Sequence, residues 1–216
     1  MKLKQNLDIV LYEKIKESFI KGEYELGQKI DIDELAEKYE VSRTPIIQAI
    51  KCLSNEGMLE TGRGGKIAIP QYTPTKVKQI YDMRLLLEKY AIELICRSDN
   101  PRSLTRLESY ANECQSAYEA DDSVTASKAD LKFHREIVLY AANECLDSLY
   151  GKVQGQCLVV NYLLKKTSSQ YHRDRCCLEH REIINGLKAR DYEKSAAMLE
   201  DHLKRNVERL LSELPQ

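Results

Sequence analysis

The stretch that decides the fold is Val41-Ser42-Arg43-Thr44-Pro45-Ile46-Ile47-Gln48-Ala49-Ile50. Ser42 is suited to cap a helix, because its hydroxyl can accept a hydrogen bond from a free N–H of the first turn. Pro45 falls inside that turn, where the missing N–H of proline costs least. Apolar contacts to a core are expected from Ile46, Ile47, Ile50 and Leu53. The stretch therefore predicts a capped helix that is packed on one side.

The outer side of this predicted helix carries groups suited to DNA. Arg43 offers positive charge for a phosphate, and Thr44 and Gln48 offer hydrogen-bonding groups for base edges in the major groove. The net charge of −1 gives no support of its own. Any basic surface must therefore be local, and the prediction of a reading helix depends on what surrounds it.

The neighbouring segments complete a known arrangement. The expected elements are a helix over 6–21, a short helix capped by Asp31 with Glu34 as its capping-box partner, the quoted helix running to Glu56, and strands near 58–60 and 66–69. Gly62-Arg63-Gly64-Gly65 lies between the two strands and permits the positive φ of a tight hairpin. Three helices and a small β-hairpin predict a winged helix-turn-helix over residues 1–70.

The composition describes a cytoplasmic, helix-rich protein. Of the 216 residues, 43% are hydrophobic and 31% charged, with 2 Phe and no Trp. No apolar run approaches the ~18 residues of a membrane span, and the first residues lack a signal-peptide core. The 7 Cys show no CxxC spacing, so we expect reduced thiols.

A second, mainly α domain is expected after a proline-flanked linker at 71–74. Beyond the linker the sequence shows no strand pattern, and residues 75–216 predict an antiparallel all-α bundle. The six expected helices lie near 74–97, 101–119, 123–142, 144–166, 171–189 and 192–213.

Three of the four histidines fall on apolar helix faces. Asp130 and His134 are four residues apart and share one face, and His180 and His202 lie on later helices. The residues allow either ordinary core histidines or a divalent metal site, and such donors suit Zn, Ni, Mn or Fe without choosing among them. The adjacent Cys176 and Cys177 are either reduced thiols or an additional thiolate.

Arg84 lies in the middle of an apolar helical stripe. A buried arginine needs an anionic partner. That partner is either Glu88, four residues later, or a carboxylate ligand held by the guanidinium fork. The residues alone leave both alternatives open.

The chain resembles the GntR family of bacterial transcription regulators. The resemblance rests on Gly22-Glu23-Tyr24, Gly27-Gln28-Lys29-Ile30, Glu34-Leu35-Ala36-Glu37, Val41-Ser42-Arg43-Thr44-Pro45, Glu56-Gly57-Met58-Leu59 and Arg63-Gly64-Gly65. The second domain is similar to the FCD ligand-binding domain of the FadR-like subfamily. There the matching residues are Arg84 with Leu87-Glu88, Asp130 to His134, Asn143, Glu179-His180, Leu187 to Asp191 and His202-Leu203. Six helices, as opposed to seven, point to the VanR-like branch.

The resemblance implies a ligand-responsive regulator, by default a repressor, that binds a palindromic operator in double-stranded DNA as a homodimer. The implied DNA-binding residues are Ser42, Arg43, Thr44 and Gln48 on the helix and Arg63, Gly65 and Lys66 on the wing. The implied metal ligands are Asp130, His134, His180 and His202. The implied effector is a small organic acid bound by the metal, Arg84 and Asn143, with the linker as hinge.

Two positions depart from the family pattern. Ile47 stands where an arginine usually touches DNA, and Asp33 replaces a basic residue. Two other classes of function also remain open. A metal-dependent enzyme could use the Asp and His donors to activate water, and a helical interaction protein would need neither metal nor ligand.

Overall fold

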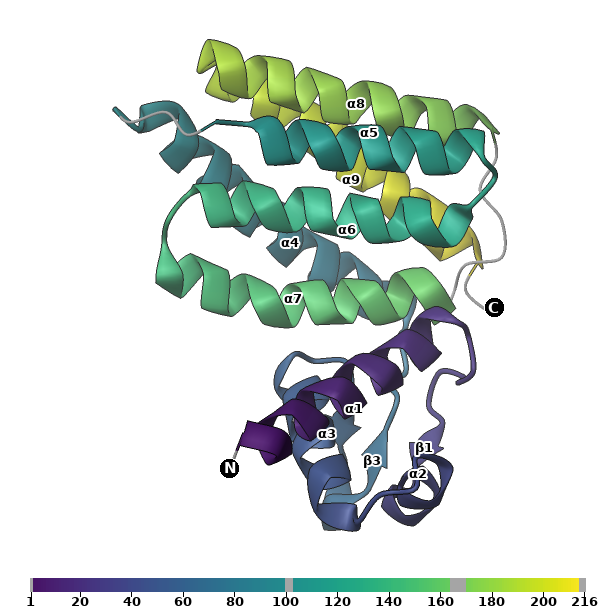
Figure 1. Cartoon of the computed structure of the whole chain (residues 1–216). Coiled ribbons are helices and arrows are strands. Elements are labelled where there is room, and N and C mark those ends of the chain that lie inside the picture. The colour runs from purple at the N-terminus through teal and green to yellow at the C-terminus, as the bar shows by residue number, and fades with distance from the viewer. Residues whose placement is uncertain (1, 100–102, 164–169, 214–216) are drawn as a thin grey trace.

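The computed structural model describes residues 2–99, 103–163 and 170–213, and it separates into an N-terminal head and a helical bundle (Figure 1). The predicted helix start at 101 and helix end at 166 lie outside these residues. No described helix combines the length and the hydrophobicity that a membrane span requires.

The head is a winged helix-turn-helix, as the sequence predicted. Its elements are α1 (Lys2–Ile20), β1 (Lys29–Ile30), α2 (Ile32–Lys38), α3 (Arg43–Asn55), β2 (Glu60–Thr61), the 3-10 turn η1 (Arg63–Gly65) and β3 (Ile67–Ala68). Buried side chains of α1, including Ile15 and Phe19, and of α3, including Ile46 and Leu53, belong to one core. The helix α1 begins four residues before the predicted position.

The sheet has three strands, and the prediction of a two-stranded hairpin was incomplete. The order is β1-β3-β2 and both pairings are antiparallel, with Lys29 opposite Ala68 and Thr61 opposite Ile67. β1 is only two residues long, too short to show the alternation that identifies a strand in a sequence. It joins the chain before α2 to the wing and so fixes the wing against the head.

The expected capping bond of Ser42 is absent from the structure. Ser42 does occupy the N-cap position with an extended backbone, but its side chain makes no capping hydrogen bond to α3. Asp31, by contrast, caps α2 as predicted, and its Oδ1 accepts from the N–H of Asp33 at 2.7 Å. The first turn of α3 therefore leaves backbone N–H groups that the Ser42 side chain does not satisfy.

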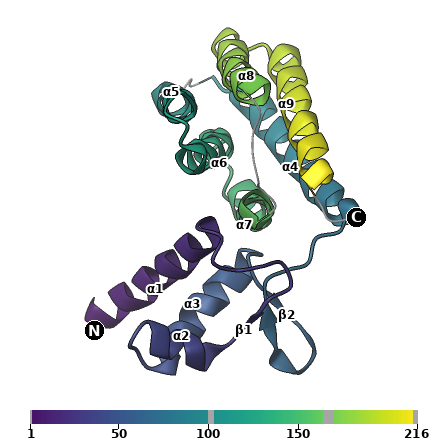
Figure 2. The ribbon, with the colours of Figure 1, turned by 90° about the vertical axis from the view of Figure 1, so that its right-hand side faces the viewer.

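The second domain is an all-α bundle of six described helices. They are α4 (Pro74–Arg97), α5 (Thr105–Glu119), α6 (Ser123–Tyr140), α7 (Glu144–Leu163), α8 (Gln170–Ala189) and α9 (Tyr192–Glu213). Thr73 caps α4 by accepting from the N–H of Lys76, with Pro74 in the first turn. Figure 2 shows α5, α6 and α7 along one side of the bundle and α4, α8 and α9 along the other.

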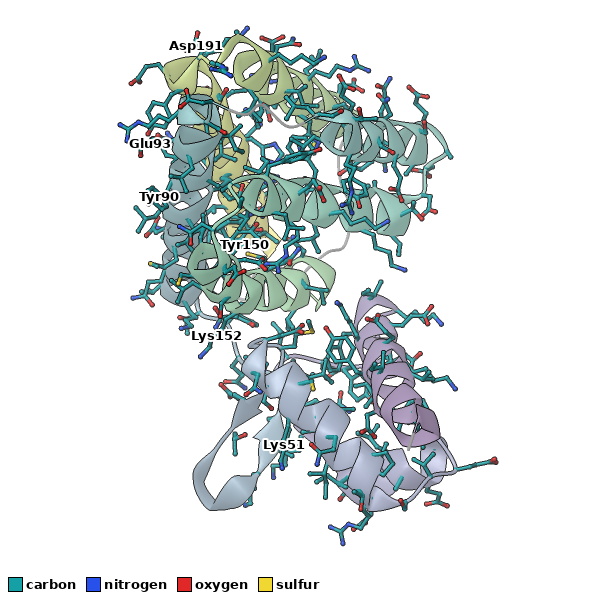
Figure 3. The ribbon with its side chains drawn as sticks, turned by 60° about the vertical axis from the view of Figure 1, so that its left-hand side comes forward. Lys51, Tyr90, Glu93, Tyr150, Lys152 and Asp191 are labelled. Carbon is teal, nitrogen blue, oxygen red and sulfur yellow. The ribbon has the colours of Figure 1, made fainter. Side chains whose placement is uncertain are left out.

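The head contacts the bundle through α7, the helix nearest to it in Figure 1. At Gly155 of α7 the backbone approaches the carbonyl of Glu56 so closely that a Cβ would lie 1.9 Å from its oxygen. Glu56 follows the last residue of α3, and its carboxylate accepts a 2.6 Å hydrogen bond from Tyr12 of α1. Lys152 of α7 lies at the same junction (Figure 3). The end of the predicted reading helix thus contacts the bundle directly.

Candidate metal centre and DNA interface

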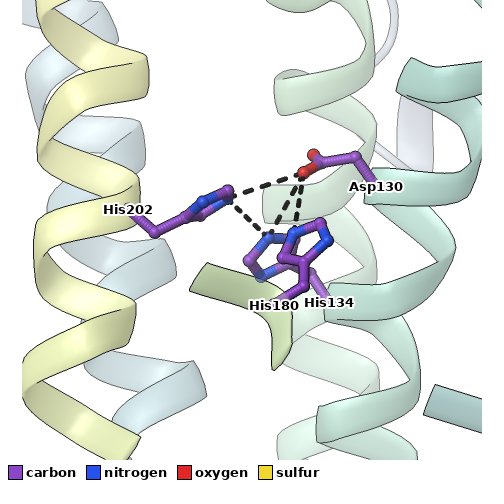
Figure 4. Close-up of side chains that lie close together, drawn as sticks. All are labelled: Asp130, His134, His180 and His202. Carbon is purple, nitrogen blue, oxygen red and sulfur yellow. Dashed lines mark hydrogen bonds and ion pairs between the residues drawn. The ribbon is translucent and has the colours of Figure 1, made fainter. Parts of the chain in front are cut away.

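The structure brings together the four residues that the sequence singled out as metal ligands. Asp130 and His134 come from α6, His180 from α8 and His202 from α9, and all four side chains are buried (Figure 4). Asp130 Oδ1 lies 3.2 Å from His180 Nε2, 3.5 Å from His202 Nε2 and 3.6 Å from His134 Nε2. The Nε2 atoms of His134 and His202 are 3.1 Å apart. The donor atoms therefore converge on one point between three helices.

These separations fit a single divalent ion. Two donors that each lie about 2.1 Å from one ion are roughly 3.0 to 4.2 Å apart for bond angles between 90° and 180°. These four separations, 3.1 to 3.6 Å, all fall in that range. Three imidazoles and one carboxylate are also a chemically suitable donor set. The buried Asp and His group can hold a metal ion.

Carboxylates behind two of the histidines orient them. Glu88 Oε2 is 2.6 Å from His134 Nδ1, and Glu179 Oε2 is 3.1 Å from His202 Nδ1. A bond at Nδ1 fixes the ring and leaves Nε2 as the donor to a metal. For His180, Nδ1 has no hydrogen-bond partner among the described residues, but its ring stacks on Phe133 with centroids 4.1 Å apart. Sequence reasoning quoted Glu179 beside His180 without assigning it a role, and it missed the contact of Glu88 with His134.

Glu88 also holds Arg84. The guanidinium Nε is 2.7 Å from Glu88 Oε1, so the structure contains the protein partner that the sequence offered as one of two alternatives. Tyr150 of α7 donates a 2.6 Å bond to the same oxygen. Both Nη atoms of Arg84 are buried and have no hydrogen-bond partner in the described part of the chain. The two Nη groups, which carry four of the five N–H donors of the guanidinium, are therefore available to an anion.

Burial and neighbouring charges set the protonation of the site. Burial opposes ionisation of Glu88, but the charges of His134 and Arg84 lower its pKa to about 2. Burial likewise opposes ionisation of Asp130, yet His134 and the bonds from the other histidines hold its pKa well below the usual range. For His180 burial lowers the pKa, and Cys176 and Asp130 outweigh it and raise the pKa to about 10. A metal ion must displace that proton.

Asn143, the second predicted effector residue, lies at the N-terminal end of α7. Its side-chain oxygen accepts a 3.0 Å hydrogen bond from the N–H of Leu146 and so caps the start of α7. A cavity of about 20 Å³ next to Asp130 is lined by other residues, among them Asn161 and Asn206, and not by Asn143. Asn161 accepts a 3.0 Å bond from Tyr81 on α4. Asn161 and Asn206 were not predicted, because no sequence pattern links α7 and α9 to Asp130.

The predicted DNA-binding residues lie on one exposed end of the head. Ser42 is exposed at the N-cap of α3, Arg43, Thr44 and Gln48 are exposed on the helix, and Gly65 and Lys66 are exposed at the wing. Arg63 belongs to the turn at the wing tip. Lys51, labelled in Figure 3, and Asn55 continue the exposed face of α3 at the spacing of Thr44 and Gln48. Asp33, the unusual acidic residue, pairs with Arg43 at 3.1 Å.

Comparisons with known proteins identify the two parts. Residues 10–69 match the bacterial regulatory proteins of the gntR family, and residues 79–205 match the FCD domain. The chain belongs to the GntR family and carries an FCD domain. It is a ligand-responsive, DNA-binding transcriptional regulator and not an enzyme.

Two relatives and one solved structure illustrate the match. The uncharacterized HTH-type transcriptional regulator YdhC of Bacillus subtilis is 26% identical over 203 residues, covering 92% of this chain and 88% of YdhC. The regulator LutR of the same organism is 28% identical over 214 residues, covering 88% and 94%. The structure of Escherichia coli McbR/YncC covers 95% of this chain and 97% of its own, with a TM-score of 0.81 at 20% identity. This last likeness shows that the GntR and FCD parts share a fold with McbR/YncC.

Proposed function

We propose that this GntR regulator is a homodimeric repressor that releases its operator when a small carboxylate binds beside a metal in the bundle. One observation carries the proposal: a convergent set of metal donors lies in the same buried network as a guanidinium whose two Nη groups have no hydrogen-bond partner among the described residues. His134 of the donor set shares Glu88 with Arg84. A carboxylate effector suits this network, because a guanidinium fork and a metal cation both favour carboxylate oxygens.

The residues present define what each part contributes. Asp130, His134, His180 and His202 would hold the divalent ion, which supplies positive charge and open coordination positions when bound. Arg84 would orient the carboxylate through its two free Nη atoms. The cavity of about 20 Å³ next to Asp130 has room for about one water molecule, so an organic acid needs side chains to move apart there. That movement gives the effector a preference for one arrangement of the bundle.

A dimer is supported by an apolar stripe on α4. Met83, Leu86 and Tyr90 follow one another at spacings of three and four residues, so they share a face, and they are 46%, 60% and 45% exposed. Tyr90 points away from the bundle in Figure 3. Exposed apolar stripes of this kind mark interaction surfaces. We assign the stripe to a second copy of the chain, because a symmetric pair of heads matches a palindromic operator.

For DNA reading we propose the exposed residues of α3 and the wing. Arg43, Thr44 and Gln48, together with Lys51, would face the major groove. The wing tip from Arg63 to Lys66 would reach the neighbouring backbone or minor groove. Gln48 and Arg43 are the groups that can read a base by paired hydrogen bonds, and Lys51 suits a phosphate. Ile47 is half-buried and leaves these residues to carry recognition.

The decisive experiment is selection of operator sequences from random DNA, repeated with a panel of small carboxylates on the metal-loaded protein. We expect a palindromic site whose affinity falls when one class of carboxylate is added. The matched variant is Arg84→Lys, which keeps a cation beside Glu88 and removes the fork. It should bind the selected site and lose the carboxylate response. An undiminished response in Arg84→Lys would refute the role of the guanidinium, and no response to any carboxylate would refute the effector class.

A further inference from the structure

Cys176 lies against the metal donors and has no role in the function proposed above. It is on α8, one helical turn before His180, and is 5% exposed. Its Sγ is 3.8 Å from Asp130 Oδ1 and 4.0 Å from His180 Nε2. It also lines the cavity of about 20 Å³ together with Asp130. The sulfur therefore lies beside two of the four metal donors, Asp130 and His180.

We propose that Cys176 supplies a thiolate ligand to the ion held by Asp130 and the three histidines. The inference rests on the proposed metal site and adds a fifth protein donor to it. It also assigns the class of metal. A thiolate favours Zn²⁺, Co²⁺ and other ions that accept sulfur, and disfavours Mn²⁺ and Mg²⁺, which prefer oxygen.

The separations agree with a shared ion. With a metal–sulfur distance of about 2.3 Å and a metal–nitrogen or metal–oxygen distance of about 2.1 Å, the two donors lie roughly 3.1 Å apart at a 90° bond angle and 4.4 Å apart at 180°. Both separations of Cys176 Sγ, 3.8 and 4.0 Å, fall inside this range. These two separations allow Cys176 to share an ion with Asp130 and His180. Cys176 groups with Cys114 and His180 and not with all four donors, so side chains adjust when one ion is bound by all five.

The surroundings of the sulfur also favour a thiolate bound to a cation. Cys114 of α5 contributes a second sulfur, and the donor atoms of Cys114, Cys176 and His180 all lie within 4.8 Å of one another. Ala117, Ala126 and Ala129 belong to the same buried cluster as the two cysteines. An anion in such small apolar surroundings is costly unless a cation compensates it. A metal at the four-donor site provides that cation.

Binding changes no oxidation state. A lone pair of Cys176 Sγ forms the bond to the metal, and any proton on the sulfur passes to solvent. The sulfur of Cys114 lies within 4.8 Å of Cys176 Sγ, and its S–H can be donated to the bound sulfur. Cys114 is a positioning residue, so its loss should weaken the bond without removing it.

The test uses the full chain loaded with Co²⁺, whose thiolate complexes absorb in the near ultraviolet while its visible bands report binding itself. Wild type should bind one Co²⁺ per chain and show both absorptions. Cys176→Ser should keep the visible bands and lose the near-ultraviolet band. The matched control is Cys177→Ser, the next residue on the same helix and outside both donor groups, which should retain both. The affinity of Cys176→Ser for Zn²⁺ should fall at least about tenfold, because substituting a residue that only hydrogen-bonds to a metal ligand already lowers metal affinity by about that factor.

A second measurement avoids dependence on any variant. X-ray absorption of the Zn²⁺-loaded wild type should show one sulfur neighbour at about 2.3 Å in addition to nitrogen and oxygen. Visible Co²⁺ bands without the near-ultraviolet band, or zinc with no sulfur neighbour, would overturn the thiolate and leave the four-donor site standing. Failure of the wild type to bind either ion would overturn both. Two ions per chain, with the sulfur on the second, would also refute a shared ion.

Discussion

Two glycines in α7 give a direct test of how the head is joined to the bundle. Gly151 and Gly155 are both interior to the helix and four residues apart. A Cβ at Gly155 would lie 1.9 Å from the carbonyl oxygen of Glu56 and 2.9 Å from its carbonyl carbon, whereas a Cβ at Gly151 would meet nothing within 4 Å. The obstacle at Gly155 is backbone, so no side-chain rotation can relieve it. Alanine at the two positions should therefore have opposite effects.

The magnitudes follow from two terms. Replacing glycine by alanine inside a helix stabilises the folded state by about 1 kcal/mol. Inserting a methyl group into a filled site costs about 1 to 3 kcal/mol. For Gly151→Ala only the gain in helix stability applies, so the free energy of unfolding should rise by about 1 kcal/mol. For Gly155→Ala both terms apply, so it should lie about 1 to 3 kcal/mol below Gly151→Ala, and each kcal/mol shifts the Tm by about 2 to 4 °C at this size.

The assay is urea unfolding of the two variants in parallel, combined with limited proteolysis. If Gly155→Ala relieves the clash by moving the head away, segment 69–73 becomes exposed and should be cut faster than in Gly151→Ala. The same movement should weaken the response of operator affinity to the carboxylate effector. Equal stability and equal cleavage of the two variants would refute the claim that α7 docks the head through Gly155.

Four further outcomes are expected. Arg43→Ala should lose about tenfold or more in affinity for the selected operator with an unchanged Tm, because its pair with a surface carboxylate is exposed; gel shift and thermal melting measure the two, and full affinity would contradict the reading role. His134→Ala should lose the metal that wild type retains when purified without chelator, as elemental analysis can decide. Leu86→Glu should convert the dimer to monomer in sedimentation, while Leu178→Glu, equally apolar and exposed on α8, should stay dimeric; a dimer in both would place the interface elsewhere. Tyr150→Phe should cost about 1 kcal/mol of unfolding free energy, since a buried carboxylate loses one of its bonds, and an unchanged urea midpoint would contradict that bond.

The elements best predicted from the sequence are those with strong local patterns. The reading helix and the six helices of the bundle follow from apolar periodicity and from stops such as Gly57 and Asp191. β1 could not be predicted, because its two residues form a strand only by pairing with β3, a partner almost forty residues later. The prediction of a capping bond from Ser42 was wrong for a related reason. A residue type favours a bond, but the local backbone decides whether that bond forms.

In the bundle the sequence pointed to residues and could not supply their partners. The four-residue spacing in α4 and α6 suggested the pairs Arg84 with Glu88 and Asp130 with His134. The bond between Glu88 and His134 joins those two helices, and no spacing rule connects them. For Asn143 a family resemblance suggested an effector role, which stays a prediction, and the structure adds that this side chain caps α7.

The same helix, α7, connects the two halves of the proposed switch. Tyr150 bonds the carboxylate that holds Arg84 and orients His134, and Gly155, little more than one turn later, lies against the end of α3. A rigid helix that is fixed at both points transmits a displacement, so an effector that moves Glu88 shifts the support of the reading helix.

The segment between the domains also favours coupling through α7. Tyr72 is buried within it, and exposing such a side chain costs about 1.5 to 3 kcal/mol. That is the size of a typical coupling free energy, which corresponds to about a 5- to 150-fold change in affinity. Bending of segment 70–74 therefore requires that effector binding supply enough free energy to expose Tyr72. A displacement of α7 does not require this, because Tyr72 then stays buried. Accelerated cleavage at 69–73 on effector binding would favour bending of the segment, and unchanged cleavage would favour α7.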